Sequence, residues 1–317
     1  MTRESRALEI KRIFQSLEKK MEAKLISDHI ISFKIPDDIF SNMRVATNRF
    51  LKAFSGVQIN SEEDANLEKT LSLVSKNKEK LVDITPNGLC VPKHHSSFEY
   101  NMYAKSLSDF LFDYIFYNES EVLFFDAPPN MRIKFAEVDE INMKRGGPSE
   151  IPHLDSWSNA NVDSFTLHIP FGGDVERNRV QLFDVPSNFE ENWMSPRKFA
   201  DGVDIANQYS KIASDSISGW GYLLDASCIH SSNRDSNASA RISTDFPITI
   251  KRENEPHLTD EDVAISKMEM SNELGKIPAS LMRSLGFKSI LIPQNSTGIF
   301  ESFDRTKHPG AIRAVSV

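Results

Sequence analysis

The chain has 317 residues, of which 39% are hydrophobic and 26% are charged, and its formal net charge is −8. That composition is ordinary for a soluble globular protein, and no stretch approaches the roughly 18 continuous apolar residues of a membrane span. The acidic balance offers no broad cationic surface, which argues against nucleic acid as a partner. Two cysteines, far apart in the chain, exclude both a disulfide framework and a thiolate zinc site.

The N-terminus has no apolar signal segment and no small-residue cleavage site, so we expect a cytoplasmic protein without a membrane association. Together with the acidic charge, this favours a small molecule as the partner. No feature of the sequence predicts the oligomeric state.

Region 1–120 is predicted to be mainly helical. Apolar residues recur at helical spacing from Glu4 to about Ile26, again after Asn60, and in an aromatic stretch from Ser97 to Tyr117. Just before the aromatic stretch, His94 and His95 are adjacent. Neighbouring side chains diverge in a helix or a strand, so the two are interpreted as helix-entry residues rather than as a second metal site. We expect these helices to pack on the region that follows.

Region 121–250 is predicted to form short strands separated by Gly, Pro, Asn and Asp turns, a pattern typical of a jelly roll. No helical pattern alternates with the strands, which disfavours a parallel α/β sheet. A longer separator near 184–218 is interpreted as an insertion. The predicted strands are 121–125, 131–138, 164–171, 178–183, 219–226 and 240–250.

Region 251–317 returns to helical spacing in two stretches, TDEDVAISKMEMSNELG and PASLMRSLGF. We expect C-terminal helices that flank the strands, followed by a tail containing Gly, Pro and Ser.

A candidate metal site begins with His153 and Asp155 in the stretch IPHLDSW. Side chains two residues apart in an extended strand point to the same side, so an imidazole and a carboxylate can reach one ion. A distant third ligand, His230, ends the apolar stretch GWGYLLDASCIH. Two histidines and one carboxylate form the facial triad typical of non-heme iron(II), which leaves coordination positions open for other ligands.

A candidate anion site follows eleven residues after His230. Arg241 and Ser243 lie two apart in a predicted strand, so a forked guanidinium and a hydroxyl face the same side. This pair suits a carboxylate at the far end of a dicarboxylic acid.

In these motifs, HxD, a long gap, a histidine and then Arg-x-Ser, the sequence resembles the iron(II)- and 2-oxoglutarate-dependent oxygenase superfamily. The resemblance covers roughly residues 122–250 and implies a double-stranded β-helix (jelly roll, cupin-like) with helical flanks. It implies that His153, Asp155 and His230 hold Fe(II), that Arg241 and Ser243 bind 2-oxoglutarate, and that O2 is the oxidant.

Other polar residues near these motifs are open to two interpretations. Arg145, Trp157, Asn159 and Asn161 flank the His–Asp pair, where they either contact substrate or shape the loop. Ser164, Thr166 and His168 share a predicted strand face, where they could line the barrel near the cosubstrate, but His168 is interpreted as a structural histidine and is not placed in the ligand set.

The function expected from these motifs is a dioxygenase that hydroxylates a small-molecule biosynthetic intermediate, such as an amino acid, a sugar or a natural-product precursor, with release of succinate and CO2. The motif does not separate hydroxylation from desaturation, cyclisation or epoxidation. Two alternatives stay open: a metal-dependent cupin enzyme that does not use 2-oxoglutarate, for which Arg241 is dispensable, and a non-catalytic barrel that acts as a binding scaffold.

Overall fold

The computed structural model describes residues 2–57, 66–81, 83–85, 87–90, 92, 94–115, 123–125, 129–137, 149–159, 164–213, 216–250, 277–278, 289–293 and 312–316. The chain divides into two compact units. Unit 1 comprises Met1–Asp37, Pro86–Gly88 and Arg132–Asp245, and unit 2 comprises Asp38–Thr85, Leu89–Met131 and Phe246–Val317. The boundaries expected near residues 120 and 250 therefore stay a prediction.

Unit 1 contains a large antiparallel sheet. Strand β9 (Trp220–Asp225) pairs on one side with β2 (Ile30–Lys34) and on the other with β6 (Ser164–Gly173). The order continues to β1 (Ala23–Ser27) beyond β2 and to β11 (Arg241–Ile250) beyond β6, and β5 (Asn130–Lys134) also pairs with β11.

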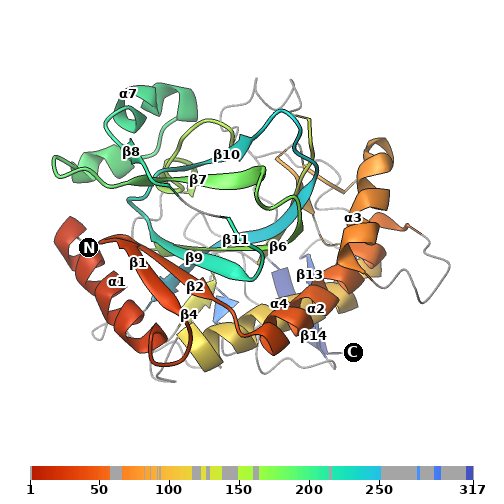
Figure 1. The fold of residues 1–317 in the computed structure, drawn as a ribbon. Coiled ribbons are helices and arrows are strands. Elements are labelled where there is room, and N and C mark those ends of the chain that lie inside the picture. Colours follow the sequence, from red (N-terminus) through yellow and green to blue (C-terminus); the bar gives the residue numbers. More distant parts are fainter. Residues whose placement is uncertain are drawn as a thin grey trace. The chain divides into compact units, whose positions relative to one another are not determined.

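A second, smaller sheet in the order β10-β7-β8 lies in the same unit, and Figure 1 shows β10 and β7 layered over β9, β6 and β11. Its strands are β10 (His230–Arg234), β7 (Asn178–Asp184) and β8 (Ser210–Lys211), and His153 extends it through an isolated bridge to His230.

The chain order of unit 1 switches repeatedly between the two sheets. From β5 the chain passes to His153 in the small sheet, then to β6, to β7 and β8, to β9, to β10 and finally to β11. This antiparallel connectivity is that of a double-stranded β-helix, the fold that the sequence pattern implied. The predicted insertion near 184–218 contributes β8 to the small sheet, together with η5 (Glu191–Met194), η6 (Phe199–Gly202) and α7 (Val203–Ala206).

One buried cluster joins the two sheets of unit 1. Val180 and Leu182 of β7 belong to it together with Tyr222 and Leu224 of β9. Burying these apolar side chains is the main force that holds the two layers together.

The N-terminal segment differs from its prediction. Helix α1 (Arg3–Leu17) ends well before Ile26, the expected end, because β1 begins at Ala23 and forms a hairpin with β2. The helical prediction was wrong here because β1 pairs with β2, which in turn pairs with the distant β9, and local periodicity does not reveal such pairing.

Unit 2 contains α2 (Asp37–Ser55) from Asp38 onward, α3 (Leu67–Lys76) and α4 (Ser97–Phe110), and α4 continues as one π-helical turn, Leu111–Ile115. Aromatic side chains of α2 and α4 pack against each other, and the ring centroids of Phe50 and Tyr100 are 5.2 Å apart. Shorter elements in the chain are η2 (Lys78–Lys80), β3 (Leu89–Cys90), η3 (His94–Ser96) and α6 (Ser156–Asn159).

The described residues beyond 250 are strands. Strand β12 (Ile277–Pro278) pairs with β4 (Leu123–Phe125), and β13 (Ser289–Pro293) pairs with β14 (Ile312–Ser316). The two helices predicted for this region fall almost entirely outside the described residues.

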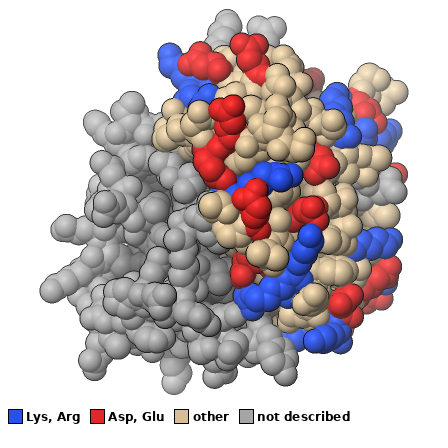
Figure 2. Space-filling view, turned by 90° about the vertical axis from the view of Figure 1, so that its left-hand side faces the viewer, with Lys and Arg blue, Asp and Glu red and all other residues tan. Residues whose placement is uncertain are grey.

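None of the helices in the described part of the chain is both long enough and apolar enough to cross a membrane. On the face drawn in Figure 2, acidic and basic side chains of the described residues lie intermingled rather than in a field of one sign.

Candidate metal centre

Three potential metal-ligating side chains meet in unit 1: His153, Asp155 and His230, whose ligand atoms all lie within 4.8 Å of one another. Asp155 Oδ1 is 3.6 Å from His230 Nε2, and the two imidazole centroids are 4.6 Å apart. Two imidazoles and one carboxylate converging on one point are the donor set that a divalent iron takes in a facial triad.

Backbone pairing brings the two histidines together although 77 residues separate them in the sequence. The His153 N–H donates to the carbonyl of His230 at 3.0 Å, and the His230 N–H donates back to the carbonyl of His153 at 3.1 Å. Directly opposed residues in an antiparallel pair project their side chains to the same face, so this bridge aligns both rings.

The neighbours of the cluster orient its side chains. His153 Nδ1 lies 2.7 Å from the carbonyl of Ile151, so Nδ1 carries the proton and Nε2 is the nitrogen left for a metal. The Thr166 hydroxyl donates to Asp155 Oδ2 at 2.5 Å, and the ring of Phe199 stacks on His153 at 4.1 Å.

Electrostatics keep His153 in the form that binds metal. Burial lowers the pKa of His153 to about 3, and positive charge at His230 lowers the pKa further, while Asp155 opposes both. A neutral imidazole is the form that coordinates a cation.

Arg241 and Ser243 both lie inside unit 1, near the start of β11. Arg241 is 3% exposed and Ser243 is 1% exposed. Arg241 Nε and Nη1 and Ser243 Oγ have no hydrogen-bond partner in the described part of the chain. Burial lowers the pKa of Arg241 to about 10, but the guanidinium still carries its charge at neutral pH.

Comparisons with models of known protein families and with curated proteins find no match to this sequence. Among solved structures, the chain is similar to the non-heme alpha-ketoglutarate-dependent carbocyclase SnoK from nogalamycin biosynthesis, with 13% identity and a TM-score of 0.39, over 79% of this chain and 84% of that one.

Two further similar structures are EctD from S. alaskensis with 2-oxoglutarate and 5-hydroxyectoine, and an N-substituted L-amino acid dioxygenase from Burkholderia ambifaria AMMD. For EctD the identity is 10% and the TM-score 0.38, over 73% of this chain and 78% of that one. For the dioxygenase the identity is 13% and the TM-score 0.34, over 71% of this chain and 86% of that one. The double-stranded β-helix of this chain is defined by its own strand order.

Thr166 and Phe199 were not predicted as site residues. The strand pattern places Thr166 on one face with His168, but no sequence rule relates Thr166 to Asp155 eleven residues earlier. Phe199 lies in η6, within the predicted insertion, where no motif marks it as a neighbour of His153.

The residues predicted to flank the metal pair fall in different places. Trp157 is 3% exposed, and its indole Nε1 donates to the carbonyl of Trp193 at 2.7 Å, so the ring packs within unit 1. Asn159 ends α6, and its side chain lies outside the described part, as do Arg145 and Asn161. Contact of these four residues with substrate stays a prediction.

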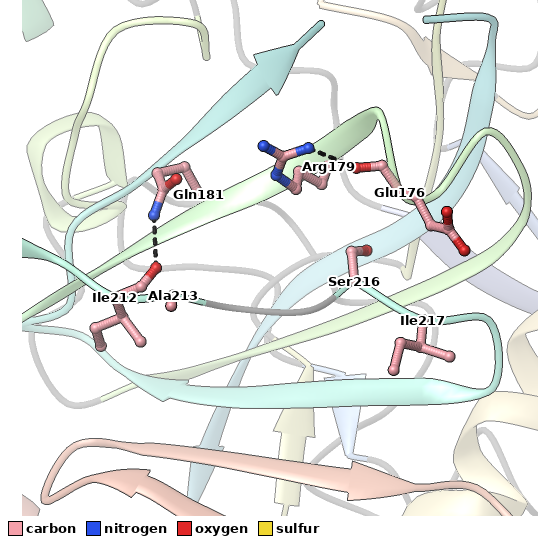
Figure 3. Close-up of a pocket in the computed structure, with 7 residues that line it drawn as sticks. All are labelled: Glu176, Arg179, Gln181, Ile212, Ala213, Ser216 and Ile217. Atoms are coloured by element: carbon pink, nitrogen blue, oxygen red, sulfur yellow. Dashed lines mark hydrogen bonds between the residues drawn. The ribbon is translucent and has the colours of Figure 1, made fainter.

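A cavity of about 450 Å³ is lined by residues of β7 and by residues between β8 and β9 (Figure 3). Arg179 and Gln181 line it, whereas Leu182 is the cross-strand partner of His230. Since neighbouring residues of a strand face opposite sides, this cavity lies on the face of the small sheet that points away from the metal centre.

Proposed function

We propose that this protein is an iron(II)- and 2-oxoglutarate-dependent oxygenase that hydroxylates a small-molecule biosynthetic intermediate. The observation that carries the proposal is the occurrence, in one double-stranded β-helix, of the His153–Asp155–His230 cluster and a buried Arg241 that lacks a partner among the described residues.

The metal cluster fits a ferrous ion through its donor set. His153 offers Nε2 because its Nδ1 faces a backbone carbonyl, and Asp155 offers one oxygen because Thr166 holds the other. Three protein ligands leave open positions for a chelating cosubstrate and for oxygen.

The Arg241 site fits a carboxylate because a buried charge is costly unless it is paired. The neighbouring cations already have partners: Arg132 binds Asp245 at 2.6 Å, and Arg234 binds Glu150 at 2.9 Å. No carboxylate of the described residues forms an ion pair with Arg241. An anionic ligand would therefore supply the missing partner, and Ser243 would add a hydrogen bond.

With iron bound, the site would supply oxidative chemistry in which 2-oxoglutarate gives succinate and CO2, and one oxygen atom enters each of the two organic products. The protein's own residues would bind and orient the metal and the cosubstrate. His153, Asp155 and His230 hold the metal, Arg241 and Ser243 hold the distal carboxylate, and Phe199 covers one face of His153 against water.

The first test is an anaerobic titration of the metal-free protein with ferrous iron and then with 2-oxoglutarate, followed through the weak visible charge-transfer band of the chelate. We expect the band in the wild-type protein and its loss in Asp155→Ala, which should also bind iron far more weakly. Succinate formation in air then measures turnover.

The second arm of this test uses Arg241→Ala. Loss of a charge-assisted contact to a buried carboxylate should raise the Kd for 2-oxoglutarate by about thirty-fold to several-thousand-fold, with iron affinity unchanged. Arg179→Ala is the matched control, because Arg179 lines the cavity on the opposite face of the small sheet.

The outcomes separate the alternatives. If iron binds and Arg241→Ala leaves 2-oxoglutarate affinity unchanged, a cupin enzyme without this cosubstrate is favoured. If the wild-type protein binds neither iron nor 2-oxoglutarate, the barrel is a non-catalytic scaffold and the proposed function is wrong.

A further inference from the structure

His168, like Arg241 and Ser243, is a buried polar side chain with at least one atom that has no hydrogen-bond partner among the described residues. It is 4% exposed, and its Nε2 has no hydrogen-bond partner among the described residues. Buried imidazole nitrogens are normally hydrogen-bonded, so an unpaired one needs an explanation. The structural role expected for this residue stays a prediction, and no protein group of the described residues bonds Nε2.

The strand position of His168 places its ring on the face of β6 that Thr166 shares with the metal centre. His168 follows Thr166 by two residues on β6, so both side chains lie on one face, and Thr166 already contacts Asp155. The neighbouring strand in the sheet is β11, which carries Arg241 and Ser243.

The charges that act on His168 come from both sites. Burial lowers its pKa to about 3, and the positive charges of Arg241 and His230 lower it further, whereas Asp245 opposes them. Both His230 and Arg241 therefore lie near enough to act on the imidazole electrostatically. It is neutral, and one tautomer of a neutral imidazole carries its N–H donor on Nε2.

An aromatic neighbour lies next to the His168 ring. Tyr222 lies opposite His168 on β9, with ring centroids 6.4 Å apart and nearly parallel planes. A ring held by a large aromatic neighbour keeps its nitrogen in a defined place, which is what a binding group requires.

From this geometry we infer that His168 binds the cosubstrate: its Nε2–H donates a hydrogen bond to the carboxylate that Arg241 and Ser243 hold. The inference rests on the proposed function and adds a third contact to that carboxylate. Three donors from two adjacent strands would surround the carboxylate and fix its position. That position would determine how long a dicarboxylic acid must be to reach the metal with its other end.

The test measures the Kd for 2-oxoglutarate by calorimetry on manganese-loaded protein, which binds without turning over. His168→Leu removes the donor and is compared with His168→Gln, whose amide nitrogen occupies nearly the position of Nε2. We expect His168→Leu to raise the Kd by about ten- to one-hundred-fold and His168→Gln to stay within about five-fold of wild type. The Kd for manganese itself should not change in either variant.

Arg241→Ala, measured alongside, separates the two proposals. If Arg241→Ala weakens 2-oxoglutarate binding and His168→Leu does not, the inference about His168 is wrong and the proposed function stands. Equal weakening in the Leu and Gln variants would also overturn it, since only ring shape would then matter. If neither Arg241→Ala nor His168→Leu has an effect, the proposed function itself fails.

Discussion

At the scale of single residues, Thr166 shows how a side chain outside the ligand set controls it. Its hydroxyl donates to Asp155 Oδ2, leaving Oδ1 on the side of His230. We expect Thr166→Val to weaken iron affinity by about ten- to one-hundred-fold, because the carboxylate loses its orienting bond. Competition with a coloured chelator measures this affinity.

Thr166→Ser is the control for that prediction, because it keeps the hydroxyl and loses only a methyl group. We expect it to bind iron nearly as the wild type does. Equal iron affinity in the Val variant would mean that Asp155 is oriented by its backbone alone.

Lys134 is a buried cation whose charge costs stability. It is 3% exposed, its ammonium contacts Ser149 and lies 3.6 Å from Glu150, and burial lowers its pKa to about 7. Between this value and the ordinary value of 10.5, the unfolded chain holds a proton that the folded chain does not. Stability therefore rises with pH across that window.

The expected result is that the wild-type protein gains stability between pH 7 and pH 10 relative to Lys134→Met, by at most about 4 kcal/mol. Urea unfolding of both proteins at several pH values measures the difference. If the free energy of unfolding changed with pH equally in the two proteins, Lys134 would keep its ordinary pKa in the folded chain.

At the scale of elements, ion pairs as well as apolar contacts hold α1 against the rest of unit 1. Arg6 is fully buried, binds Glu191 of η5 at 3.0 Å and lies 3.8 Å from Asp225 at the end of β9. Asp225 also contacts His29 and Ser227. Removing Arg6 would leave the buried carboxylate of Asp225 without the guanidinium and with the contacts of His29 and Ser227.

We expect Arg6→Ala to lower the free energy of unfolding by about 3 to 5 kcal/mol, because the buried carboxylate of Asp225 loses its guanidinium neighbour. Arg12→Ala on the same helix is the matched control. Its ion pair with Glu9 is largely exposed, and its loss should cost less than about 1 kcal/mol. Urea unfolding compares the two variants, and similar small losses in both would show that α1 is not held by Arg6.

At the scale of the whole molecule, the β-helix is assembled from segments that are distant in sequence. Unit 1 combines the first 37 residues with residues 132–245, because β2 pairs with β9 across almost two hundred residues. Local periodicity does not reveal such non-local pairing. It therefore predicted that the first helix extends into the residues of β1, and it did not predict β10, a short polar strand that includes His230.

The sequence by itself determined six strands in 121–250, since their alternation and turn residues are local properties, and it identified the His153, Asp155, His230, Arg241 and Ser243 pattern through spacing. Only the tertiary structure decided that the three possible metal ligands lie together, because a backbone bridge between His153 and His230 closes a 77-residue separation. It also decided that Arg241, Ser243 and His168 are buried without partners among the described residues. Burial and hydrogen bonding depend on which strands become neighbours, and that is a property of the folded chain rather than of any stretch of it.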